Sequence, residues 1–278
     1  AAGPGGLMAW DDGVGRNTLM IGTSIDSAVT VGRSGEGPGE FGMIDRVGWS
    51  SDTVWATDLF QARAQFFDRN GELLDVRRLP SGAGWLRAPN GKFLAIGSRP
   101  IEAKGWSVLQ VAGDSSAPVA ADTLFHFPGP GGKVVTIPMA GGGSMITSEP
   151  FAPMAVVAAA PDGSRFCGSE PLVGDQVRIR CIDYHGALIR DTVLALAPVP
   201  LGDSTWNHAV SRFVRKDEGT RSAVEALLTR PQSIPLVTAL GVDRDGALWI
   251  DRSERGARVQ HFLRLNPRGD VRDTLLLI

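Results

Sequence analysis

Apolar and polar residues alternate with a period of two in several short stretches of the chain, and turn residues separate these stretches. RIRCID at residues 178–183 and ARVQHF at residues 257–262 show the alternation most clearly. A period of two is typical of strands that bury one face. Asn-Gly and Asp-Gly dipeptides, which supply the positive φ angles of tight hairpins, lie between such strands. They occur at residues 70–71, 90–91, 162–163 and 245–246. The pattern predicts an all-β protein.

The same order of strands and turns recurs along the chain. Three copies are clear: residues 52–79, 162–194 and 245–277. Each copy has one large aromatic residue in an apolar strand: Trp55, Phe166 or Trp249. Units of about 40 residues with four short strands are typical of propeller blades. We therefore expect a single β-propeller domain over residues 1–278, with six blades preferred and five as the alternative. The aromatic residues should be buried between neighbouring blades.

Two stretches of the sequence resemble a known family. VWATDLFQARAQFFDRNGELL resembles an NHL-type blade. GRSGEGPGEF, residues 32–41, is similar to the blade-connecting loop of bacterial extracytoplasmic six-bladed β-propellers related to NHL-repeat proteins. The resemblance covers most of residues 30–278 and implies a six-bladed propeller that is usually exported. That family has no single activity, so the resemblance implies no particular reaction.

Residues 197–232 interrupt the blade rhythm just before the last blade and are predicted to be partly helical. Ser204 is a candidate cap for the first helix, and Ser222 with Glu225 has the spacing of a capping box for the second. Val210, Phe213 and Val214 share one face at helical spacing. The sequence predicts two short helices that bury this face against the propeller.

The helical insertion is the candidate lid of a binding cleft. Trp206 can stack on a ligand, His208 can exchange protons and Arg212 can hold an anion. A shared cleft requires these residues to face inner-strand residues such as Arg46 or Arg87. The alternative is an elaboration of the packing that binds no ligand.

Two cysteines, Cys167 and Cys181, are predicted to lie on adjacent antiparallel strands of one blade. The midpoint of the two positions falls in the connecting loop, so the residues are expected nearly opposite each other. Directly opposed residues have Cβ atoms about 4.5–5.5 Å apart, close to disulfide geometry. We predict a disulfide bond, which would favour an oxidising compartment. Two buried free thiols are the alternative.

Charge and motifs narrow the classes of function. The net charge of −2 and the pI near 6.1 give no basic surface for nucleic acid. The sequence contains no run of 18 apolar residues, so no transmembrane segment is predicted in this chain. The sequence lacks the motif spacings of a catalytic serine, of a phosphate-binding loop and of a zinc site. We therefore expect no metal and no cofactor. Calcium enters only if the chain is a lactonase-type propeller with oxygen ligands in its channel.

The preferred function is a periplasmic or extracellular binding or scaffold module. Its loop-rich face would take a protein or glycan partner, as an accessory subunit of an envelope or membrane-associated assembly. Membrane association would come through a partner or a removed N-terminal signal. The alternative is a hydrolase or lyase, lactonase-like or glycan-acting, at the channel mouth. The sequence leaves open whether the chain is an enzyme, although the missing catalytic motifs favour a protein without enzymatic activity. We also expect residues 7–33 to lie beside residues 258–278 and close the ring.

Overall fold

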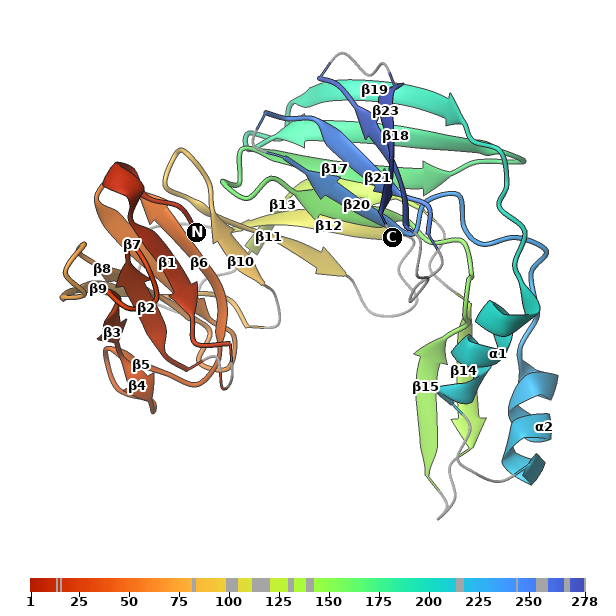
Figure 1. Cartoon of the computed structure of the whole chain (residues 1–278), viewed down its shortest axis with the longest axis horizontal. Helices are drawn as coiled ribbons and strands as arrows, with labels where there is room; N and C mark the ends of the chain where they lie inside the picture. Colours follow the sequence, from red (N-terminus) through yellow and green to blue (C-terminus); the bar gives the residue numbers. More distant parts are fainter. Residues whose placement is uncertain are drawn as a thin grey trace.

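The computed structural model describes most of the chain and consists mainly of antiparallel sheets (Figure 1). The residues outside the description are 14, 16, 82–83, 99–104, 112–120, 130–132, 139–142, 214–217, 244, 254–259, 268–270 and 278. In the described part, five sheets are each built from strands that follow one another in the sequence, as in propeller blades. We number these sheets as blades I to V.

The bounds of the elements follow the chain. A short 3-10 helix, Pro4–Gly6, precedes blade I. Blade I contains β1 (Met8–Asp11), β2 (Leu19–Gly22) and β3 (Val29–Val31). The parallel pair β4 (Arg33–Ser34) and β5 (Glu40–Phe41) follows. Blade II contains β6 (Ile44–Ser50), β7 (Thr53–Asp58), β8 (Arg63–Phe67) and β9 (Leu73–Arg78). Blade III contains β10 (Trp85–Arg87), β11 (Phe93–Ser98), β12 (Gly105–Val111) and β13 (Ala121–Pro128).

The second half of the chain holds two more blades and two insertions. β14 (Val134–Pro138) and β15 (Ser144–Ser148) form a separate hairpin. Blade IV contains β16 (Val156–Ala159), β17 (Arg165–Pro171), β18 (Gln176–Asp183) and β19 (Leu188–Ala195). Two helices follow, α1 (Asp203–Ser211) and α2 (Glu218–Leu227). Blade V contains β20 (Ala239–Val242), β21 (Leu248–Asp251), β22 (Gln260–Leu265) and β23 (Val271–Leu277).

The predicted turns form where the sequence places them. Gly71 and Gly186 each have a φ of 87° and lie between the last two strands of blades II and IV. Each backbone N–H donates to the carbonyl three residues earlier, that of Asp68 at 3.1 Å and that of Asp183 at 3.0 Å. The two aspartate carboxylates also accept backbone N–H groups of the turn. Glycine adopts this backbone conformation without the steric penalty of a Cβ atom, so these positions determine where the hairpins turn.

Aromatic residues fill the space between blades, as predicted for two of the three repeat positions. Trp55 and Phe166 are 3% and 0% exposed and belong to one cluster that joins blades II, III and IV. Trp249 is different: it is only half-buried, and the guanidinium of Arg264 lies 5.6 Å from its ring centroid. Its neighbours Leu248 and Ile250 point to the opposite face of the sheet, toward blade IV. Trp249 therefore lies on the face of blade V that no described blade covers.

The blades form an arc, and the described strands do not close it into a ring (Figure 1). β1 lies beside β6, β6 beside β10, β11 beside β16 and β16 beside β20. The expectation that residues 7–33 lie beside residues 258–278 is wrong for the described strands. Within the described residues, β1–β3 form a sheet of their own, with one isolated bridge from Met8 to Ala2, and β23 pairs with β22. Blade V supplies all four of its own strands and leaves no position for a strand from the other end of the chain.

The hairpin β14–β15 and the helices α1 and α2 pack against each other, although about 50 residues separate them in the sequence. We call this unit, residues 134–151 with 199–234, the side module. Its core contains Ile137 of β14, Val210 of α1 and Val224 of α2, exposed 1%, 0% and 2%. The segment between blades III and IV thus forms part of the side module and not a sixth blade. The described strands thus form five blades, the alternative to the six blades that the sequence pattern favoured.

The two helices lie inside the predicted segment 197–232, but their first residues differ from the prediction. Gly202 occupies the N-cap position of α1, so Ser204 lies within the first turn and is not the cap. Ser222 and Glu225 lie inside α2 and do not form its start. Val214 lies outside the described residues. Among the described residues, no helix is both long and apolar enough to cross a membrane.

Cys167 and Cys181 are directly opposite each other in the register of β17 and β18. Their sulfur atoms form a disulfide bond within blade IV. Both residues are buried, 1% and 2% exposed, in the apolar cluster between blades IV and V. The bond therefore links the two central strands of blade IV on the face that packs against blade V.

Candidate functional site

A large cavity among the described residues lies where the side module meets blades IV and V. Its volume is about 760 Å³, within the range of about 300–1,000 Å³ common for small-molecule sites. Three segments line it: residues 145–156, residues 205–213 and residues 235–238. The first segment runs from β15 to β16, the second is most of α1, and the third leads into β20. The cavity thus brings together parts of the chain that are distant in sequence.

One face of α1 borders the cavity and the other face enters the core of the side module. Thr205, His208, Ala209 and Arg212 line the cavity and are spaced three and four residues apart, so they share one helical face. Val210 is fully buried on the other face. Because the helix is anchored on its apolar face, the position of its polar face relative to the cavity is fixed.

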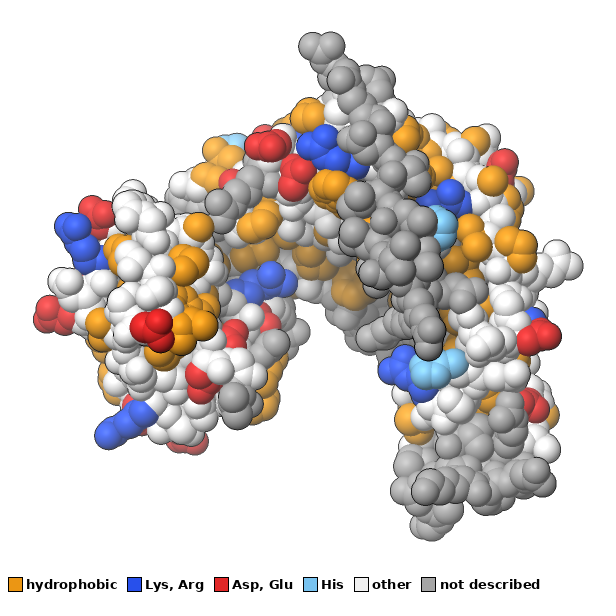
Figure 2. Space-filling model, viewed as in Figure 1, with side chains coloured by type: hydrophobic (Ala, Val, Ile, Leu, Met, Phe, Trp, Pro, Cys, Tyr) orange, Lys and Arg blue, Asp and Glu red, His pale blue; other side chains and the backbone are white. Residues whose placement is uncertain are grey.

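His208 and Arg212 form the polar edge of the cavity. Both are exposed, and neither side chain makes a hydrogen bond or an ion pair with the residues that the structure describes. They lie one helical turn apart, a spacing at which two side chains reach the same ligand group. Figure 2 shows the molecule hollowed between the N-terminal blades and the side module. A His side chain lies beside a Lys or Arg side chain at the edge of this hollow in Figure 2.

The remaining wall of the cavity is mainly apolar. Met145, Phe151, Met154 and Phe213 contribute the large side chains. Phe151 has a φ of +59°, in the left-handed region that a bulky residue rarely adopts. Its ring lies 6.5 Å from that of Trp206, centroid to centroid. The surrounding packing therefore holds a conformation that costs about 1–3 kcal/mol at a position beside the cavity, as is common at binding sites.

Glu149 is the only acidic residue among the described lining residues, and its carboxylate is already engaged. Oε1 accepts the backbone N–H of Thr229 at 2.5 Å and the ammonium of Lys133 at 3.1 Å. Burial alone would raise the pKa of Glu149, but these two donors hold the pKa below its ordinary value. Glu149 therefore stays ionised and ties the hairpin of the side module to the end of α2.

The structure brings only two of the five predicted site residues to this cavity. His208 and Arg212 line it. Trp206 is 8% exposed and belongs to the core of the side module, because its position on α1 points it toward the hairpin. It is thus a core residue, and the stacking role that we expected for it is wrong.

Arg46 and Arg87 lie on blades II and III and do not line the cavity. Arg46 is paired with its neighbour Asp45, with Nε 3.8 Å from Oδ2. The guanidinium of Arg87 lies 5.2 Å from the ring centroid of Phe66, in a cation–π contact. Burial, together with the nearby Arg77, lowers the pKa of Arg87. Among the described lining residues, this cavity therefore does not combine these arginines with the helices, as the predicted cleft required.

The sequence alone does not reveal that β15 and its connection to β16 line the cavity. Met145, Phe151 and Met154 carry no recognisable motif, and their contribution depends on the contact between two insertions. The one signal in the sequence is a break in the alternation, with two prolines at residues 150 and 153 between two strands. Such a break predicts an irregular connection but not what the connection contacts.

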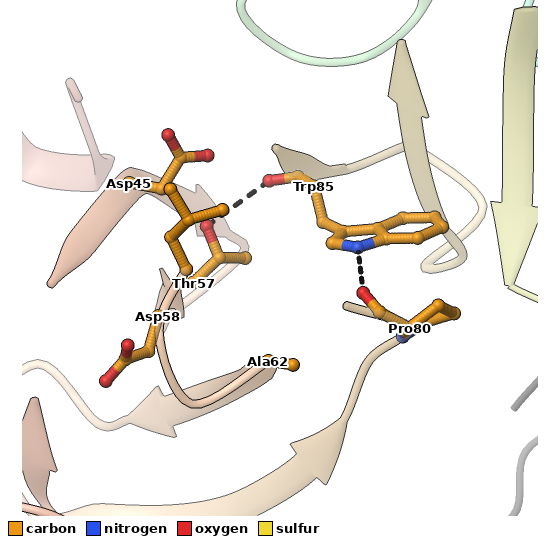
Figure 3. Close-up of a pocket in the computed structure, with 7 residues that line it drawn as sticks. Asp45, Thr57, Asp58, Ala62, Pro80 and Trp85 are labelled. Atoms are coloured by element: carbon orange, nitrogen blue, oxygen red, sulfur yellow. Dashed lines mark hydrogen bonds between the residues drawn. The ribbon is translucent and has the colours of Figure 1, made fainter. Parts of the chain in front are cut away.

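A smaller hollow between blades II and III is a structural joint (Figure 3). It has no interior volume for a water molecule. Thr57 Oγ1 donates to the carbonyl of Trp85 at 3.3 Å, and Trp85 Nε1 donates to the carbonyl of Pro80 at 2.8 Å. Asp58 points away from Trp85 (Figure 3) and accepts four backbone N–H groups at 2.7–3.2 Å. These polar groups hold chain segments together and are not available to a ligand.

The glycine-rich loop at residues 32–41 is likewise structural. It connects blade I to blade II, as the sequence indicates. The guanidinium of Arg63 donates to the carbonyls of Glu36, Gly37 and Glu40 at 2.7–2.9 Å. Gln65 of the same strand exchanges hydrogen bonds with Gly39 and Glu40. The loop is thus bound along its length to blade II.

The sheets and their stacking define a protein of the β-propeller class, and the side module with its cavity is an addition to that fold. The prediction of an all-β propeller fold is thus confirmed.

Comparison with known proteins assigns neither a family nor an activity to this chain. No protein-family model and no curated protein sequence matches the chain. Among solved structures, Kuenenia stuttgartiensis hydrazine synthase aligns with a TM-score of 0.42 and 10% identity, over 97% of this chain and 63% of that chain. This chain thus spans less than two thirds of that relative. The nidogen/laminin complex aligns with a TM-score of 0.43 and 10% identity, over 98% and 79%. Virginiamycin B lyase from Staphylococcus aureus aligns with a TM-score of 0.42 and 12% identity, over 100% and 83%.

Proposed function

We propose that this chain is an extracytoplasmic binding module, and that it binds its ligand in the cavity between the side module and blades IV and V. The observation that carries the proposal is the cavity itself: about 760 Å³ with an apolar wall and an unengaged polar edge. Pockets of this size and lining are typical of ligand sites. His208 and Arg212 supply the polar edge, and their side chains are not committed to other described residues.

The described lining favours binding over acid–base catalysis. A hydrolase or lyase needs a positioned acid or base. The one carboxylate of the lining, that of Glu149, is neutralised by Lys133 and bonded to the backbone of Thr229. His208 has no described orienting partner of the kind that fixes a catalytic imidazole. The cavity thus offers recognition groups, and the enzymatic alternative has no specific observation in its favour.

Two further parts of the proposal concern the compartment and the partner. The disulfide bond between Cys167 and Cys181 supports an oxidising compartment, such as the periplasm or the extracellular space. The exposed side module, which projects from the arc in Figure 1, is the surface on which we expect a macromolecular partner to approach the cavity.

The proposal is tested by filling the cavity. Ala209 lines it from α1, and an Ala209→Trp substitution places an indole inside it. Ser204→Trp is the matched control, because Ser204 is exposed on the same helix and does not line the cavity. Thermal unfolding is measured with a panel of amphipathic acids, peptides and oligosaccharides, since a ligand that binds the folded state raises Tm.

The expected result is that at least one member of the panel raises Tm in the wild type and in Ser204→Trp, and not in Ala209→Trp. A ligand that stabilises Ala209→Trp as strongly as the wild type binds elsewhere. That result would overturn the assignment of the cavity as the binding site.

A further inference from the structure

The composition of the cavity also points to the chemical class of its ligand. This inference rests on the proposed function, since it concerns what the same cavity binds. We propose that the ligand is an amphipathic anion, with an acidic head group held by Arg212 and His208 and an apolar body against Met145, Met154, Phe151 and Phe213.

The charge of the lining favours an anion. Among the described lining residues, Arg212 alone carries a permanent positive charge, and His208, one turn away, presents ring nitrogens that can donate a hydrogen bond. The only acidic group of the described lining, Glu149, has its charge compensated by Lys133 at 3.1 Å. A cationic ligand would therefore meet an uncompensated arginine, whereas an anion would complete the pairing. Arginine is well suited to this role because its planar guanidinium binds a carboxylate or a phosphate in two places.

The remaining lining favours an apolar body over a sugar. Apolar side chains, chiefly those of two methionines and two phenylalanines, outnumber the four hydroxyls of the described lining, those of Thr147, Ser148, Thr205 and Thr238. A sugar needs a partner for each of its hydroxyls when water is removed. Methionine side chains adapt to irregular apolar shapes, so this wall suits a flexible chain. Val156 at the start of β16 and Val237 before β20 extend the apolar surface onto the propeller. The ligand would therefore span from the polar edge on α1 toward blades IV and V.

The head group and the body can be tested separately with two probes that differ only at the head. Dodecanoate carries a carboxylate and 1-dodecanol does not, and both are used below their aggregation limits. Kd is measured by calorimetry for the wild type, with octanoate and decanoate as shorter homologues. We expect dodecanoate to bind at least tenfold more tightly than 1-dodecanol, because a hydrogen bond to a charged group contributes about 1.5–3 kcal/mol. Each CH₂ that enters the cavity should tighten binding about fourfold.

Two variants assign the effects to residues. Arg212→Gln should lower the affinity for dodecanoate about tenfold or more and leave the affinity for 1-dodecanol unchanged. Met154→Gln should weaken both probes to a similar extent, because it alters the apolar wall. Arg33→Gln is the matched control, since Arg33 is an exposed arginine on another part of the chain. Arg212 follows the last turn of α1, so thermal unfolding of Arg212→Gln is recorded to show that the helix remains folded.

The outcomes separate the two proposals. Equal binding of dodecanoate and 1-dodecanol, with no effect of Arg212→Gln, would show a binding cavity whose ligand is apolar and not anionic, and would overturn this inference alone. A second result would also overturn this inference: dodecanoate affinity that is unchanged in Met154→Gln but falls as much in Arg33→Gln as in Arg212→Gln. The anion would then bind at the surface. Absence of binding by every probe, together with no stabilising ligand in the wider panel, would overturn the proposed function itself.

Discussion

The blades and the side module are built on different principles. Blade IV takes all four strands from residues 156–195, and each strand pairs with its neighbour in the sequence. The side module has no such order: its core joins residues 134–151 to residues 199–234. The comparison shows that repeated local pairing produces the scaffold. The cavity arises where two non-repeated segments meet each other and the scaffold.

The two regions also differ in how their polar groups are used. In blade II, the carboxylate of Asp58 and the two terminal nitrogens of the Arg63 guanidinium are bound to backbone groups, so they stabilise the fold. In the side module, Glu149 is similarly engaged, but His208 and Arg212 face the cavity without described partners. Groups left unpaired at a cavity are available to a ligand, and this difference identifies the candidate site.

The largest expected effects compare one core aromatic residue from each region. Phe166→Ala removes a fully buried side chain between blades III and IV, and Trp206→Ala removes the largest side chain of the side-module core. Each should cost about 3–5 kcal/mol. The Phe166 variant should lower the protection of amide hydrogens throughout the blades. The Trp206 variant should lower it in α1, α2 and the hairpin only.

Hydrogen exchange followed by mass spectrometry resolves these segments. If Trp206→Ala lowered protection equally in blade II, the side module would not be a separate cooperative unit, and the distinction between the two regions would fail.

The next effect concerns the disulfide bond, which belongs to the scaffold. Cys167 and Cys181 are 14 residues apart, and a loop of about this length is stabilised by about 3 kcal/mol when it is closed. The double variant Cys167→Ala/Cys181→Ala should lose this stabilisation in chemical denaturation and keep its affinity for any cavity ligand. Mass spectrometry of the unreduced wild type should show no alkylated cysteine. Two alkylated thiols in freshly purified protein would contradict the bond.

The smallest effect concerns Glu149, the link within the side module. Glu149→Gln removes the charge that Lys133 and the N–H of Thr229 bind, and should cost about 1.5–3 kcal/mol of side-module stability. The pKa of Glu149 is lowered in the folded state, so its stabilisation is present above the unfolded pKa of about 4.3 and is lost as the pH falls through the folded pKa.

The stability difference between wild type and Glu149→Gln should therefore shrink as the pH falls below about 4.3. Amide exchange of α2 measured at pH 7 and under acidic conditions checks this. A difference that is constant over that range would mean that the carboxylate charge does not contribute, and that only the shape of the side chain matters.

Much of the scaffold was predictable because it depends on short-range patterns. Gly71 and Gly186 set the turns through their φ angles, and the alternation in residues 178–183 indicated a strand with one buried face. The repeat then placed Trp55 and Phe166 between blades. Two predictions were wrong because they depended on which segments lie next to a blade: the burial of Trp249 between two blades, and the contact between residues 7–33 and 258–278 that would close the ring.

The candidate site also has a part that the local sequence predicted and a part that only tertiary packing decided. Helical spacing in residues 203–213 was enough to place His208 and Arg212 on one face of a helix, because that arrangement is local. The rotation of the helix, which buries Trp206 and turns Arg212 toward the cavity, came only from the tertiary structure. The packing of α1 against β14 and β15 decides it. Such a contact depends on the shapes of two surfaces about 60 residues apart in sequence, and no short-range pattern encodes that fit.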